Sequence, residues 1–273
     1  MKFRMRRLLF LAALLLAFLI LTPYAIGYQI AFSDVVFTSG WLLFAIVLFL
    51  SSYNVRKKLT YPPLLKSSTW LQIHIYLGAA SLVLFLFHTG GKIPAGNLDI
   101  ALYTLFSLMV ASGFFGLYLT RTIPATLSSR GNEVIFERIP MFRRQVKDRV
   151  EQIILQSVEE SDSSILAEYY DSYLMYFLSG PRNILGHLVR SERTSSRLRH
   201  ELRGADRYLD ARDKELASEL LDLIKLKDDL DFHYARQGLL KLWLFFHIPM
   251  TLVLLMFLVA HIVLIYAFTG GAS

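Results

Sequence analysis

Long apolar segments alternate with polar connections along this chain, and these segments predict its architecture. Five apolar runs are each long enough to cross a bilayer, which takes about 20 residues in an α-helix. They cover residues 8–27, 34–52, 70–89, 99–120 and 240–268. We therefore predict an all-α fold, a polytopic membrane bundle of five transmembrane helices.

The first run follows a basic N-terminal stretch, as the apolar region of a secretory signal peptide does. Against cleavage, the run extends through Leu21, and the sequence Pro23-Tyr24-Ala25 that follows is a poor cleavage site. We expect this first helix to be retained, and its removal would not change the orientation of the other four.

A polar insert separates the fourth run from the fifth. A helical stripe within residues 141–159 predicts one amphipathic helix, and Pro181 after Gly180 predicts a break in the chain. Further on, leucines recur every seven residues, and this spacing is typical of a long helix packed on one partner helix. They are Leu202, Leu209, Leu216, Leu223 and Leu230. We expect this helix to continue into the fifth span.

The predicted division is therefore residues 1–121 with four spans, an insert at 122–238 that forms a coiled-coil-like helical hairpin, and residues 239–273 with the fifth span. Two readings of the hairpin stay open. The leucine stripe packs on the insert's own first helix, or it docks a partner protein. We find no nucleotide-binding loop or metal motif in the insert, and we expect its histidines, His187, His200 and His233, to be solvated or to cap helices. A role of Asp231–Tyr234 near a quinone or a haem propionate is a further hypothesis.

Composition supports membrane insertion and excludes an ordinary globular enzyme. The 273 residues are 54% hydrophobic, and the mean hydropathy is +0.44. The net charge of +7 comes from outside the insert, because residues 121–241 hold 20 cations and 20 anions. The excess cations lie beside apolar runs, so they indicate membrane orientation and no nucleic-acid partner.

The cations also predict the topology. The N-terminus carries four cations and residues 53–69 carry four, whereas the connections on the other side carry only Lys92. Positively charged connections stay in the cytoplasm. We expect a bacterial-type inner-membrane protein with a cytoplasmic N-terminus and insert and a periplasmic C-terminus.

Away from their ends, the spans carry no Asp, Glu, Lys or Arg, but they carry four histidines. His74 and His88 lie in the third span, and His247 and His261 lie in the fifth. Ionisable residues at membrane depth mark functional sites. Both pairs are 14 residues apart, which is about 21 Å along a helix and close to four full turns.

Each helix therefore presents two imidazoles on nearly one face, and the two spans are parallel. His74 matches His247 on the inner side, and His88 matches His261 on the outer side. This pattern predicts two haems held by bis-histidine ligation, with iron bound by His74 and His247 in one and by His88 and His261 in the other. Gly78, one turn after His74, and Gly113 in the fourth span would leave room for the porphyrins, although small residues also serve helix packing.

Intramembrane histidines have two roles other than haem ligation. An intramembrane histidine also serves as a hydrogen-bonding residue between helices, and imidazole binds zinc. A closed zinc site needs four ligands, and we expect no carboxylate at either depth. The chain has no cysteine, which also excludes iron–sulfur clusters and covalently attached haem.

The segments Trp70-Leu-Gln-Ile-His74-Ile-Tyr-Leu-Gly78, Phe87-His88-Thr-Gly90, Trp243-Leu-Phe-Phe-His247-Ile-Pro249 and Ala260-His261 resemble membrane di-haem cytochromes b. This group includes ferric-reductase-like transmembrane domains and respiratory cytochrome b subunits. The resemblance implies two haem b groups, with a quinone as a further cofactor. It also implies transmembrane electron transfer from the quinone pool or a cytoplasmic donor to a periplasmic partner such as a c-type cytochrome.

We expect the chain to act as a subunit of an oxidoreductase complex, with any flavin or nicotinamide chemistry supplied by another polypeptide. The alternative is a membrane scaffold or transporter subunit whose cytoplasmic hairpin docks a partner. Transport is disfavoured because the spans lack intramembrane carboxylates.

Overall fold

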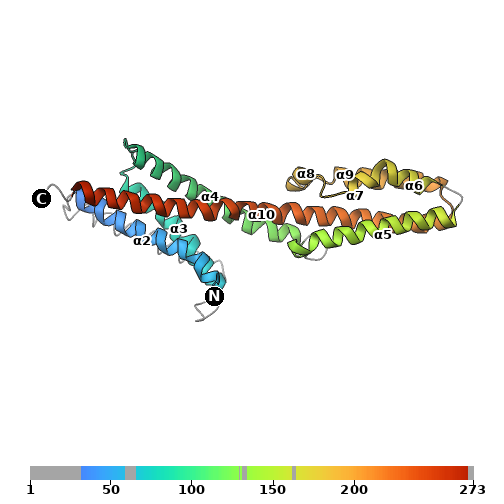
Figure 1. Ribbon diagram of the computed structural model, residues 1–273, viewed down its shortest axis with the longest axis horizontal. Coiled ribbons are helices and arrows are strands. Elements are labelled where there is room, and N and C mark those ends of the chain that lie inside the picture. The colour runs from blue at the N-terminus through green and yellow to red at the C-terminus, as the bar shows by residue number, and fades with distance from the viewer. Residues whose placement is uncertain (1–31, 59–65, 129, 131–133, 162–163, 270–273) are drawn as a thin grey trace. The chain divides into compact units, whose positions relative to one another are not determined.

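The computed structural model describes residues 32–58, 66–128, 130, 134–161 and 164–269. All regular elements in these ranges are helices (Figure 1). The all-α prediction is therefore confirmed for this part of the chain. The first predicted span, residues 8–27, lies outside the described residues.

Four of the described helices are long and apolar enough to cross a membrane. They are α2 (Phe32–Lys58), α3 (Ser67–His88), α4 (Asn97–Leu127) and α10 (Ala211–Thr269). They correspond to the second to fifth predicted spans. Helix α10 has 59 residues and is about 88 Å long. Since the apolar layer of a bilayer is about 30 Å thick, only the uncharged part of α10, residues 242–268, is suited to it.

The chain divides into two compact units, which we call the membrane unit and the insert unit. The membrane unit comprises Met1–Leu117 and Phe245–Ser273, and the insert unit comprises Tyr118–Leu244. Helices α4 and α10 contribute residues to both units.

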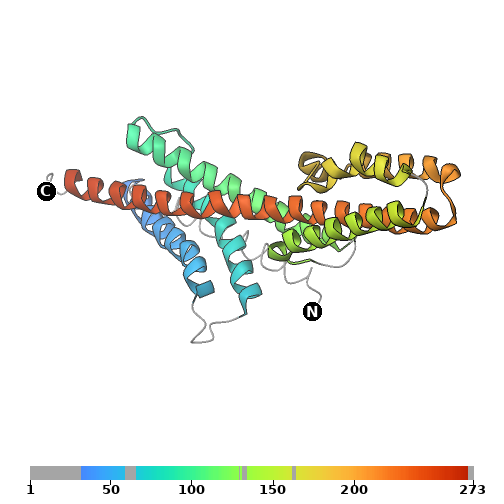
Figure 2. The same ribbon diagram turned by 45° about the vertical axis from the view of Figure 1, so that its right-hand side comes forward.

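Each of the four described helices that enter the membrane unit contributes to its core, with α2 and α3 side by side (Figure 2). Phe85 of α3 stacks on Phe106 of α4, with ring centroids 4.2 Å apart. The other buried residues of this cluster are Leu43, Val47, Leu254 and Leu258. The cluster therefore fixes α3 and α10, the two helices that carry the histidines, within one packed bundle.

The insert unit is built on the N-terminal part of α10 (Figure 1). Its other elements are η1 (Phe136–Arg138), α5 (Ile139–Glu160), α6 (Ile165–Tyr169), the π-helix η2 (Tyr170–Leu174), α7 (Met175–Leu178), α8 (Ile184–Leu188), α9 (Arg193–Ala205) and η3 (Asp206–Tyr208). The amphipathic helix predicted within 141–159 is confirmed as α5, and the predicted break at Pro181 falls between α7 and α8.

The prediction that all five heptad leucines lie on one helix is wrong. Leu202 belongs to α9, and α10 begins only at Ala211. The reason is a cap, because the Asp210 carboxylate accepts a 2.7 Å hydrogen bond from the backbone N–H of Asp213 and starts a new helix. The leucines nevertheless lie in one core with the buried face of α5. This packing supports the hairpin that is closed by the insert's own first helix.

Candidate functional site

The membrane unit brings the four predicted histidines together in two pairs. Each imidazole is partly buried on α3 or α10. His247 lies within electrostatic range of His74, and His88 lies within range of His261. One histidine of α3 and one of α10 therefore influence each other electrostatically at two places in the bundle.

Helix α2 holds the imidazole of His88. Its Nδ1 atom lies 3.0 Å from the carbonyl oxygen of Val36 and 3.3 Å from the hydroxyl of Ser39. A carbonyl oxygen only accepts hydrogen bonds, so Nδ1 of His88 donates. The close approach requires glycine at position 40, because a Cβ atom there would lie 2.8 Å from Cε1 of His88.

Helix α4 holds the two histidines of α10. Nδ1 of His261 lies 3.0 Å from a carboxylate oxygen of Asp99, at the beginning of α4. Nδ1 of His247 lies 3.0 Å from the hydroxyl of Ser112, in the middle of α4. The expectation that no carboxylate lies at the depth of either pair is therefore wrong for the outer pair. Asp99 precedes the span in sequence, and only the packing of α4 on α10 brings it to His261.

His74 is in contact with an aromatic residue of α2. Its ring centroid lies 5.4 Å from that of Tyr53, and the two rings are tilted by 44°. One turn earlier on α3, Trp70 stacks on Phe49 of α2 at 5.3 Å. These contacts place aromatic side chains of α2 along the first half of α3.

These surroundings fit a haem ligand set. A histidine that binds iron through Nε2 donates its other ring N–H to a carbonyl, carboxylate or hydroxyl. His88 and His261 have such acceptors at Nδ1, and Ser112 supplies a third partner for His247. With the proton on Nδ1, the lone pair on Nε2 is the one available to a metal ion.

The two glycines that we singled out are compatible with a bulky neighbour. A Cβ atom at Gly78 or Gly113 would meet no atom within 4 Å. The helix surfaces at these positions are therefore open, either to lipid or to a cofactor. Among the described residues, no three His, Asp or Glu side chains gather closely enough to hold a metal ion by themselves.

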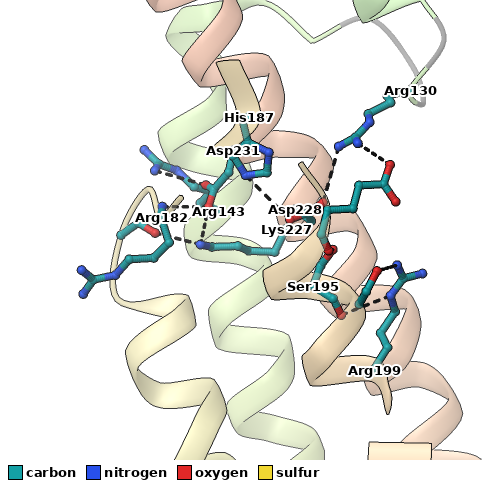
Figure 3. A network of polar contacts seen from close by, with 12 residues as sticks. Arg130, Arg143, Arg182, His187, Ser195, Arg199, Lys227, Asp228 and Asp231 are labelled. Carbon is teal, nitrogen blue, oxygen red and sulfur yellow. Dashed lines mark hydrogen bonds and ion pairs between the residues drawn. The ribbon is translucent and has the colours of Figure 1, made fainter. Parts of the chain in front are cut away.

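The insert unit contains a second cluster of charged side chains, of which the sequence had indicated only the part around Asp231 (Figure 3). Lys227 and Asp231 of α10 are almost fully buried and form an ion pair with each other. The Lys227 ammonium also donates to the carbonyl oxygen of Gly180 at 2.9 Å, and Asp231 accepts from the backbone N–H of Arg182 at 2.9 Å. Burial lowers the pKa of Lys227 and raises the pKa of Asp231, while their mutual attraction opposes both shifts.

Two of the insert's histidines are buried, contrary to our expectation, whereas His200 is exposed as expected. His233 donates from Nε2 to the carbonyl oxygen of Arg130 at 2.9 Å. His187 lies 3.7 Å from a carboxylate oxygen of Asp228. Burial lowers the pKa of His187 to about 4 and raises the pKa of Asp228 to about 6. The sequence carried one sign of this buried cluster, because Lys227, Asp228 and Asp231 lie close together on a helix that is otherwise rich in leucine.

A polar cavity of about 290 Å³ adjoins this cluster. Its charged lining residues are Arg130, Arg199, Lys225, Glu192, Asp228 and Asp229. Cations and anions are balanced in this lining, so its charge favours neither an anionic nor a cationic ligand.

Comparison of the chain with models of known protein families, with curated proteins and with solved structures finds no match.

Proposed function

We propose that this protein is a transmembrane electron-transfer subunit that holds two b-type haems by bis-histidine ligation. It would link the quinone pool or a cytoplasmic donor to a redox partner on the periplasmic side. The observation that carries the proposal is that His247 of α10 lies within electrostatic range of His74 of α3, and His88 of α3 within range of His261 of α10.

The roles of the surrounding residues follow from their contacts. Val36 and Asp99 fix the Nδ1–H tautomer of His88 and His261, and so direct Nε2 toward a ligand. Ser112 orients His247 from α4. When bound, each haem would supply one-electron chemistry without an open coordination position.

The separation of the two pairs supports transfer across the membrane. His74 and His88 are 14 residues apart on one helix, which corresponds to about 21 Å of an apolar layer about 30 Å thick. Haems bound at these two levels would each lie only a short distance from one surface of the membrane. The direction of electron flow depends on the partners on each side.

The test is spectroscopic. The protein is purified after expression with sufficient haem, and we expect a b-type reduced-minus-oxidised spectrum with about two haems per chain. His88→Leu and His261→Leu should remove one and the same spectral component, and His74→Leu and His247→Leu the other. The matched control is His200→Leu, because His200 is exposed on α9 and should leave both components unchanged.

A colourless protein obtained with adequate haem supply would overturn the proposal and favour a scaffold whose insert docks a partner. A different outcome would change only the pairing. If His88→Leu and His247→Leu remove the same component, haem binding stands, but the inner and outer ligand sets must be redrawn.

A further inference from the structure

Helix α8 presents exposed apolar side chains on the surface of the insert unit. On its inner face, His187 is almost fully buried, and its ring centroid lies 6.1 Å from that of Phe232 on α10. On its outer face, Leu185 is 79% exposed and Val189 is 77% exposed. Val189 is the C-cap residue of α8, and its backbone N–H donates to the carbonyl oxygen of Leu185 at 3.2 Å, so the two residues belong to the same turn.

The local backbone is built to hold this short helix in place. Asn183 before it and Arg190 after it both have positive φ angles, 55° and 62°. The Asn183 side chain covers Gly186 so closely that a Cβ atom at position 186 would lie 2.2 Å from it. A non-glycine residue in this conformation is uncommon, so a fixed local shape is indicated.

The contacts of Phe232 place α8 near the residues of α4 and α10 at which their predicted spans adjoin the insert unit. Phe232 belongs to a buried cluster with Leu119 and Ile123 of α4, against which Leu239, Leu240 and Trp243 of α10 pack. Leu119 lies in the last turn of its predicted span, and Leu240 begins the predicted span of α10. Arg236 lies beside the same cluster and near α8. Its guanidinium lies 5.4 Å from the centre of the Phe232 ring and within electrostatic range of both Tyr118 and Arg190.

Two exposed arginines follow the apolar residues of α8 in the sequence. Arg190 follows Val189 directly, and Arg193 begins α9, and both are exposed. The nearest carboxylate in sequence, Glu192, forms an ion pair with Arg130. Apolar side chains combined with exposed arginines at a membrane surface are typical of interfacial helices that bind anionic lipids.

We propose that α8 is an interfacial anchor that rests on the phospholipid headgroup layer at the side where the insert unit leaves the membrane. Leu185 and Val189 enter the layer between headgroups, and Arg190 and Arg193 bind lipid phosphates. The anchor fixes the insert unit against the membrane surface and is independent of haem binding.

The chain has no cysteine, so a single introduced cysteine can be labelled without background. We would place a fluorophore at Val189→Cys and reconstitute the full chain in nanodiscs that contain anionic phospholipids with brominated acyl chains. The matched control is Val158→Cys, which is 56% exposed on α5. Its neighbour Ser157 bonds Asp213, about 40 Å before Leu240 along α10.

We expect brominated lipid to quench the label at position 189 and to leave the label at position 158 unquenched. Quenching at position 189 should weaken in zwitterionic nanodiscs and in the Arg190→Glu, Arg193→Glu variant. A label at Leu185→Cys repeats the test at a second position. Equal emission at 189 and 158 would overturn the proposal, as would shielding of the label at 189 without quenching by brominated lipid, which would indicate a protein partner or a second copy.

Discussion

At the scale of single residues, the insert unit places charge where a helix core is normally apolar. Lys227 and Asp231 are buried one turn apart on α10, and each has a second hydrogen-bonding partner in the segment before α8. Removing one partner of such a pair typically costs about 3–5 kcal/mol, whereas replacing both with apolar residues is often neutral. We therefore interpret the pair as fixing the position of residues 180–182 on α10.

Asp228 gives a pH-dependent prediction at the same scale. Burial raises its pKa from 3.8 to about 6, so the folded protein binds this proton more tightly than the unfolded chain does. The resulting stabilisation is complete below pH 3.8 and is lost as the pH rises through about 6. Relative to wild type, Asp228→Asn should therefore lose about 1 kcal/mol when the pH falls from 7 to 5.

Chemical unfolding of the insert unit within the full chain, followed at both pH values, measures this difference. Asp148→Asn is the control, because the same substitution is then made at an exposed position on α5, outside the buried cluster. His187 acts in the opposite direction in both proteins, since its pKa of about 4 makes the folded state lose stability as the pH falls below 6.5. A pH-independent difference between wild type and Asp228→Asn would contradict the assignment.

At the scale of elements, α10 connects two cores with different requirements. Its first half packs Leu216, Leu220 and Ile224 against α5, and its second half packs Leu254 and Leu258 against the membrane helices. The haem ligands that we propose belong only to the second half. The packing of the first half should therefore be separable from haem binding.

Leu220→Ala tests this separation. Leu220 is fully buried, and truncation of such a leucine costs about 2–5 kcal/mol. We expect faster hydrogen exchange in α5 and the first half of α10, with the haem spectrum unchanged. Leu226→Ala is the control on the same helix, because Leu226 is 48% exposed and its truncation should change stability by about 0.5 kcal/mol or less. Loss of haem in Leu220→Ala would mean that the insert unit helps to build the haem site.

Much of the element structure could be predicted from sequence because its causes are local. Uncharged runs of about 20 residues predict spans, and the stripe from Val146 to Ile154 predicts α5. The heptad of leucines was misleading because its period passes across the cap at Asp210. A seven-residue repeat reports which residues are buried, and it does not show that the backbone is continuous between them.

The sequence was sufficient to predict the four histidines of the candidate site, but it was not sufficient to predict the residues that surround them. Equal spacing of histidines on two helices is a local pattern, and it led to His74, His88, His247 and His261. The partners at Nδ1 come from other helices at sequence separations from 49 to 162 residues, as for Ser39 with His88 and Asp99 with His261. Only tertiary packing determines such contacts, which is why Asp99 was misjudged.

At the scale of the whole molecule, the distribution of cations and the pairing of the histidines lead to the same prediction about membrane topology. Eight cations in the N-terminus and residues 53–69, against Lys92 on the other side, predict a cytoplasmic N-terminus and insert. Independently, the pairing of His74 with His247 and of His88 with His261 requires α3 and the second half of α10 to run in parallel. Residues 53–69 precede α3, and the insert precedes the second half of α10. Because the two helices run in the same direction, both connections then lie on the same side of the membrane.

Reporter fusions to the full chain test this topology. A fusion after Ser273 should report the periplasm, and a fusion within residues 160–200 should report the cytoplasm. Lys92→Ser is a control that increases the charge bias and should leave both results unchanged. If both fusions report one side, the second half of α10 does not cross the membrane, and the parallel histidine pairs cannot lie at two depths. If the fusions report opposite sides but in the reverse sense, the pairs stand and the haem of His88 and His261 becomes the cytoplasmic one.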